Sequence, residues 1–141
     1  MYAMRKEINS YRESGQLAEV LDADPHRLIQ MLLDATLESI AVASGAMKAS
    51  NYKLKGEQLG RAISIINNLA AILDYEKGGD LAAQLGSLYD YMIRRLLEGS
   101  AANDVEALAE VARLMREIKS GWDAVPEQLR LMGKSTAAPA T

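Results

Sequence analysis

Residues 24–47 read DPHRLIQMLLDATLESIAVASGAM. Asp24 is a residue that caps helices, and Pro25 suits the first helical position because its φ is already helical and its missing N–H needs no partner there. The apolar residues that follow recur at spacings of three and four, which is the period of an amphipathic helix. The segment therefore predicts a long helix that begins at Pro25 and runs to about Met47.

Two further segments with the same periodicity follow a polar interruption. The first carries its apolar stripe over residues 59–73 and is predicted to stop at Gly78 and Gly79, which adopt left-handed backbone without a Cβ penalty. Asp80 is then expected to cap the next helix, whose stripe covers residues 81–96 and which should end near Gly99. Within the earlier of these helices, Gly60 is expected to mark a close approach of a neighbouring helix.

A fourth helix is indicated by Asn103 and Glu106, whose spacing of three resembles a capping box. Its apolar stripe runs from Val105 to Trp122. Because short links cannot cross a bundle, neighbouring helices must run antiparallel. The sequence thus predicts an all-α fold, an antiparallel up-down four-helix bundle over residues 24–125.

The segments on either side of this bundle are predicted to be accessory. Residues 1–23 are too short and too polar for an equal fifth helix, so they are expected to form a partly helical N-terminal arm. Residues 126–141 end in GKSTAAPAT and are expected to form a mostly flexible C-terminal tail.

The composition argues against several classes of function. The chain has 141 residues, no cysteine and one histidine, which leaves too few ligands for a zinc site or a di-iron bundle and no thiol nucleophile. Glycine-rich phosphate loops and the G-x-S-x-G turn of serine hydrolases are missing. The net charge of −3 disfavours a nucleic-acid partner. We therefore expect no enzyme, no metal and no cofactor.

The hydropathy pattern bears on the location of the protein. No uninterrupted apolar run approaches the roughly 18 residues of a membrane span, and the N-terminal residues contain no hydrophobic stretch typical of a secretory signal. We expect no stable membrane insertion and a location in the cytosol.

His26 raises one alternative function, because histidine phosphotransfer modules are also four-helix bundles that use one exposed histidine. In those modules the histidine lies in the middle of a helix, beside a lysine and a small residue. His26 instead follows Pro25 in the first turn and precedes Arg27. We favour a solvated first-turn residue and keep phosphotransfer as the rival hypothesis.

The first three predicted helices carry more apolar residues than one core-facing stripe requires. Residues 28–43 contain 11 apolar residues among 16, where a one-faced helix needs about 7. Surplus apolar surface usually marks a partner site, although alanines also raise the count and the N-terminal arm could cover the remainder. The residues whose burial the pattern leaves open are Ile29, Leu33, Leu37, Ile65, Ile72, Tyr91 and Ile93.

A series of short motifs resembles the flagellar secretion chaperone FliS family, in the family's order and over residues 11–125. The motifs are DPHRLIQML at 24–32, LD at 73–74 leading into Gly78 and Gly79, LYDYM at 88–92 with RRL at 94–96, ND at 103–104, and Trp122. This chain departs from the family pattern at two places. Members often have Ser or Thr at the position of Asp24. Many also have the sequence Met-Leu-Tyr-Asp-Gly, in which this chain has Leu33 in place of the Tyr and Ala35 in place of the Gly.

The resemblance implies a non-enzymatic export chaperone. Such a chaperone binds the C-terminal helical region of flagellin, blocks premature polymerisation and assists delivery to the flagellar type III export apparatus. It also implies an arm, bearing Tyr11 here, that covers part of the binding surface until flagellin displaces it. Export-gate components and other flagellar regulators are further partners in this reading, and an adaptor role stays open. The expected contact residues are Tyr11, Ile29, Leu33, Ile65, Ile72, Tyr91 and Ile93.

Overall fold

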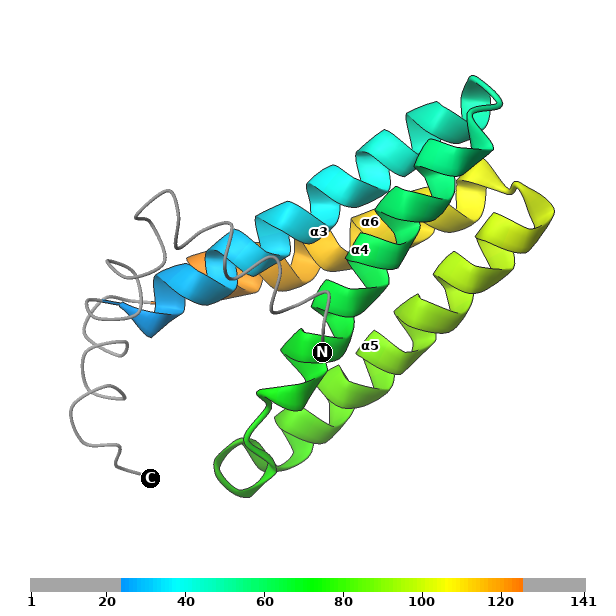
Figure 1. Cartoon of the computed structure of the whole chain (residues 1–141). Coiled ribbons are helices and arrows are strands. Elements are labelled where there is room, and N and C mark those ends of the chain that lie inside the picture. Colours follow the sequence, from blue (N-terminus) through cyan, green and yellow to red (C-terminus); the bar gives the residue numbers. More distant parts are fainter. Residues whose placement is uncertain (1–23, 126–141) are drawn as a thin grey trace.

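The fold is described by a computed structural model in which residues 24–125 are placed. The predicted arm, with Tyr11, and the predicted tail lie outside the described residues. Within residues 24–125 the chain forms four helices (Figure 1), and no strand occurs among them. They are α3 (Pro25–Lys48), α4 (Tyr52–Ala71), α5 (Tyr75–Ala102) and α6 (Val105–Asp123).

Each helix packs mainly against two neighbours. Helix α3 contacts α4 and α6, and α5 contacts the same two helices from the other side. Short turns connect consecutive helices, so that neighbours in sequence run in opposite directions (Figure 1). The predicted antiparallel four-helix bundle is confirmed. The α3/α6 pair and the α4/α5 pair diverge in Figure 1 toward the end where α4 turns into α5.

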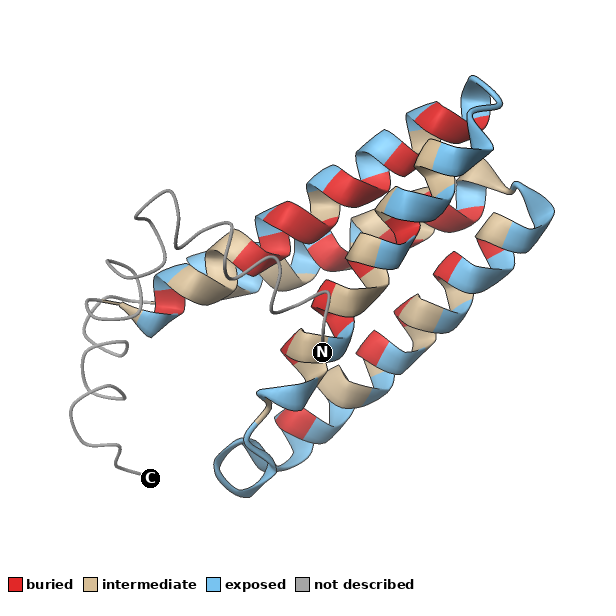
Figure 2. Ribbon diagram, in the orientation of Figure 1, coloured by how far each residue is buried: buried red, intermediate tan, exposed pale blue. Residues whose placement is uncertain are grey.

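The core receives side chains from all four helices, and Figure 2 shows their buried stripes facing the interior. Leu32, Ile66, Met92 and Val111 are each at most 2% exposed. The buried hydroxyl of Thr36 donates to the Leu32 carbonyl oxygen at 2.9 Å, so this polar group is satisfied within its own helix.

The turn between α4 and α5 differs from the sequence prediction. Helix α4 ends at Ala71, well before the glycine pair, and Asp74 caps α5 by accepting a hydrogen bond from the Lys77 backbone N–H at 3.1 Å. The expected cap at Asp80 is therefore wrong. Gly79 does have a positive φ of 52°, but it kinks α5 where it was expected to end α4. Helix α5 begins before Asp80 because the carboxylate of Asp74 already caps it.

The turn between α5 and α6 also differs by one residue. Helix α5 continues past Gly99 to Ala102, and Asn103 ends it in the left-handed conformation, with φ 51° and ψ 46°. Asp104 is the N-cap of α6 and accepts from the Glu106 backbone N–H at 3.0 Å. The capping box predicted for Asn103 is wrong, because asparagine suits both roles and the tight turn needs a left-handed residue first.

Helix α3 is the one helix within residues 24–125 that is long and apolar enough to cross a membrane by length and composition. Its buried residues, among them Leu32, Ile40 and Ala43, pack in the bundle core against its neighbours. Its apolar character is therefore that of a helix in contact with two others.

Candidate functional site

An apolar cleft of about 380 Å³ lies at the end of the bundle where α4 turns into α5. All four helices contribute to its walls. We call it the four-helix cleft. Its lining residues are Ile29 and Leu33 from α3, Leu69 from α4, Ile72, Leu73 and Asp74 from the turn, Lys77, Gly78, Leu81, Ala82, Leu85 and Tyr89 from α5, and Ile118 and Trp122 from α6.

The four-helix cleft has a buried floor and an exposed apolar mouth. Leu33 and Tyr89 are 0% and 4% exposed at the floor, whereas Ile72 and Leu81 are 53% and 63% exposed. Burial raises the pKa of the Tyr89 phenol, so the floor carries no charge at neutral pH. Large aliphatic side chains left in water at a concave site favour an apolar ligand, because covering them removes their surface from water.

The first turn of α5 shapes one side of this cleft. Tyr75 lies beside Gly86, where an added Cβ would come within 2.6 Å of the Tyr75 hydroxyl oxygen. Gly79 kinks the helix between these two residues. The glycines therefore let the first turn fold back on α5, so that Gly78 and Leu81 both face the cleft.

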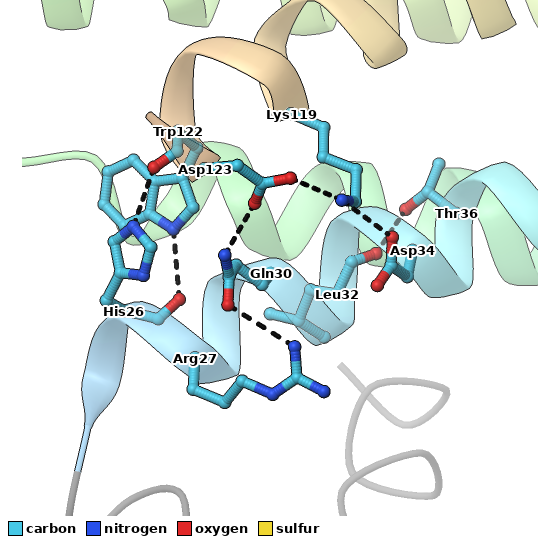
Figure 3. Close-up of polar contacts among 9 residues, drawn as sticks. All are labelled: His26, Arg27, Gln30, Leu32, Asp34, Thr36, Lys119, Trp122 and Asp123. Carbon is cyan, nitrogen blue, oxygen red and sulfur yellow. Dashed lines mark hydrogen bonds and ion pairs between the residues drawn. The ribbon is translucent and has the colours of Figure 1, made fainter. Parts of the chain in front are cut away.

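The opposite wall depends on a contact between the first turn of α3 and the last turn of α6 (Figure 3). The rings of His26 and Trp122 are stacked, with centroids 4.6 Å apart and an interplanar angle of 12°. The Trp122 indole N–H donates to the His26 carbonyl oxygen at 3.0 Å, and His26 Nε2 lies 2.7 Å from the Trp122 carbonyl oxygen. We call these two residues the His26–Trp122 pair.

Polar side chains join the same two helices on the outside (Figure 3). Gln30 Nε2 donates to Asp123 Oδ1 at 2.6 Å, and Lys119 Nζ donates to Asp123 Oδ2 at 2.5 Å. Lys119 also lies 3.5 Å from Asp34 of α3. The hydrogen bonds from Lys119 and Gln30 lower the pKa of the Asp123 carboxyl. These contacts hold the end of α6 against α3.

The structure brings some of the expected contact residues together and separates others. Ile29, Leu33 and Ile72 line the four-helix cleft. Ile65, whose burial the pattern left open, is 0% exposed in the core. Ile93 is half-buried and packs on the core outside the cleft.

Tyr91 also lies outside the cleft. Its hydroxyl donates to Glu110 Oε2 of α6 at 2.5 Å, and the guanidinium of Arg94 lies 5.7 Å from the centre of its ring. Tyr89 lines the cleft whereas Tyr91 bonds to α6, because residues two apart on a helix do not share a face.

His26 does not lie where the sequence led us to expect it. His26 is only 7% exposed, and its ring packs on Trp122. The expectation of a solvated side chain is therefore wrong. The arrangement also does not support phosphotransfer, which requires an imidazole that a partner domain can reach.

The sequence pattern placed Leu81, Ile118 and Trp122 on core stripes, but they line the cleft. The available signal was their position at helix ends, where fewer neighbouring side chains can cover them. Among the described residues, no group of three or more His, Cys, Asp or Glu side chains is arranged to hold a metal ion. The cleft lining is mostly aliphatic and aromatic, so the site is suited to binding an apolar surface.

Comparisons with known proteins identify the family of this chain. The profile of the family described as "FliS: Flagellar protein FliS" matches residues 7–129. The "Flagellar secretion chaperone FliSB" of Pseudomonas aeruginosa is 48% identical over 125 residues, which cover 89% of this chain and 98% of that protein. Proteins named "Flagellar secretion chaperone FliS" from Salmonella typhimurium and Vibrio cholerae are 42% and 36% identical, over 82% and 89% of this chain and 86% and 92% of their own lengths. The chain therefore belongs to the FliS family of flagellar proteins.

Proposed function

We propose that this protein is a cytosolic export chaperone that binds the C-terminal helical region of flagellin. It blocks premature polymerisation and assists delivery of flagellin to the flagellar type III export apparatus. The names of its relatives, flagellar secretion chaperones, support the export role. The observation that carries the choice of site is the four-helix cleft, an apolar hollow to which every helix contributes. The protein acts by binding and not by catalysis.

The shape of the cleft suits a helical client. Ile29 and Leu33 lie one turn apart on α3, and Ile72 and Leu81 face them from the mouth. An amphipathic helix docks by placing apolar residues spaced by three or four into such a groove. The face of the client that enters the cleft is then unavailable for pairing with other subunits.

The client is tested by calorimetry with a peptide of the flagellin C-terminal segment. Binding should have a negative heat-capacity change because apolar surface leaves water. The substitution Ile72→Asp should weaken binding about tenfold or more, since it places a charge at an apolar mouth. Helicity should stay unchanged because Ile72 is 53% exposed.

Leu97→Asp is the matched control, because Leu97 is 55% exposed and does not line the cleft. It should bind the peptide as the parent does. Equal loss in both variants, or no binding by the parent protein at micromolar concentration, would contradict the proposal. Ile65→Asp is unsuitable as a surface variant, because a charge at a 0% exposed core position should unfold the bundle.

A further inference from the structure

We infer that His26 is a positioning residue for the client, because it holds the Trp122 indole in place as a wall of the four-helix cleft. The inference rests on the proposed function for the identity of the client. It adds a role for a residue that does not itself line the cleft.

The first step is the two-way character of the His26–Trp122 pair. His26 contacts Trp122 at three places, namely the ring face, the indole N–H and the backbone carbonyl oxygen. Because a carbonyl oxygen can only accept, Nε2 of His26 carries the hydrogen that joins it to Trp122. The stack and the two hydrogen bonds together leave the indole one orientation relative to α3.

The second step is the place of Trp122 in its helix. It lies in the last turn of α6, which ends at Asp123. The last carbonyl groups of a helix have no partner within it, and terminal turns fray. The Trp122 carbonyl oxygen accepts from the Val125 backbone N–H at 3.2 Å, and His26 Nε2 adds a second partner at 2.7 Å. The wall of the cleft is thus stabilised at a point where a helix is otherwise least constrained.

The third step is that His26 is itself held in place. Asp24 caps α3 by accepting from the His26 backbone N–H at 3.1 Å, and Pro25 restricts the first turn. The helix start therefore places His26 opposite the end of α6. A wall that is ordered before the client arrives costs less conformational entropy on binding.

The test uses the full chain and two readouts, the affinity for the flagellin C-terminal peptide and the emission of Trp122. Trp122 is the single tryptophan of the chain. Excitation at a wavelength that tyrosine does not absorb therefore gives emission from Trp122 alone, which reports on the cleft wall. His26→Ala should weaken binding about five- to tenfold, the scale of one lost aromatic contact. It should also shift Trp122 emission to the red as the indole gains solvent. His26→Phe keeps an aromatic face for the indole but loses the Nε2 hydrogen bond, so it should recover only part of both losses.

Gln30→Ala is the matched control. Gln30 joins the same two helices by its hydrogen bond to Asp123. Its side chain is not hydrogen-bonded to Trp122 and does not line the cleft. It should leave affinity and emission as in the parent. A loss of affinity in Gln30→Ala equal to that in His26→Ala would overturn the inference, because the effect would then belong to general packing of α3 on α6.

Further outcomes separate this inference from the proposed function. If the parent protein fails to bind the peptide, the proposed client is wrong. The emission of the His26→Ala variant then tests by itself whether His26 holds the Trp122 indole in place. Unshifted emission in that variant overturns the inference whatever the client. If His26→Ala loses its helicity, His26→Phe replaces it as the deciding variant. It removes the Nε2 hydrogen bond to Trp122, so a partial loss of affinity with a red shift supports the inference, whereas parent-like affinity and emission overturn it.

Discussion

Gly60 and Gly99 both lie inside helices, but they differ in what surrounds them. The sequence suggested that Gly60 allows a close helix approach, and this is wrong, because a Cβ there would have nothing within 4 Å. At Gly99 a Cβ would lie 2.8 Å from the Ala107 Cβ and 2.9 Å from Leu108 Cδ1. The close approach of α5 and α6 occurs at Gly99, beside the turn that joins them.

The same substitution should therefore have opposite effects at these two positions. Gly60→Ala should raise the free energy of unfolding by about 0.5–1 kcal/mol, since alanine is the better helix former at an open site. Gly99→Ala should lower it by about 1–3 kcal/mol, because α6 must move to admit the methyl group. Urea denaturation of both variants measures the two values. A stable Gly99→Ala variant would show that α5 and α6 are not in close contact there.

Helix α5 is interrupted close to its start. Gly79 has φ 52° and ψ −126°, a backbone region that is essentially restricted to glycine. Asn103, at the end of the same helix, has φ 51° but ψ 46°, which is the left-handed region that asparagine tolerates. The kink and the end of the helix thus impose different requirements on the residue.

Substitutions at the kink should show this difference. Gly79→Ala should lower the free energy of unfolding by about 1–3 kcal/mol because of backbone strain. It should also weaken binding of the flagellin peptide, since the first turn of α5 forms one side of the cleft. Gly79→Asn should not recover the lost stability. Thermal unfolding and calorimetry test both effects, and a Gly79→Asn variant as stable as the parent would contradict the observed ψ.

Charged groups join the helices of the bundle across their outer surface. Glu110 of α6 accepts from the Tyr91 hydroxyl at 2.5 Å and from Arg95 Nε at 2.8 Å, both of α5. Both bonds lower the pKa of the Glu110 carboxyl, and the bond from Tyr91 has the larger effect. The same bond raises the pKa of the Tyr91 phenol. Asp123 has a lowered pKa at the α3–α6 contact for the corresponding reason.

The stability of the whole bundle should therefore fall in acid. An unfolded glutamate titrates near 4.5, and the folded pKa of Glu110 is lower. Between these two values the unfolded chain binds the proton and the folded chain does not, so the contribution of Glu110 is complete above the unfolded pKa and is lost as pH falls through the folded one. Glu110→Gln should lower stability at neutral pH and flatten its decrease between about pH 6 and about pH 3. Tyr91→Phe should have a smaller effect, because Arg95 remains.

Urea denaturation at a series of pH values measures this effect. A Glu110→Gln variant with the same slope as the parent would show that this carboxylate does not link α5 to α6 in solution.

The bundle could be predicted from sequence because its signals are local. Asp24 and Pro25 begin α3 as expected, and its apolar period ends where predicted, within one residue. The turns were harder, because Asn103 and Asp104 have similar chemistry and only the path of the chain shows which one ends a helix and which one begins the next. The glycine pair at 78–79 likewise indicated a break but not its kind.

The site was partly predictable for a related reason. The period of a helix identifies which side chains share a face, and it singled out Ile29, Leu33 and Ile72, which line the cleft. It could not distinguish Ile65, which is 0% exposed, from Ile72, which stays 53% exposed. Coverage depends on how closely the neighbouring helices approach at each level of the bundle.

By itself, the sequence of this protein determined four amphipathic helices, their antiparallel order and an apolar surplus beyond the needs of a core, because helix period, caps and loop length act over a few residues. Only the tertiary structure decided that the helix pairs diverge at one end, that the surplus lines a cleft there, and that His26 contacts Trp122 across 96 positions of sequence. Such contacts depend on the packing of all four helices together, and no local pattern encodes them.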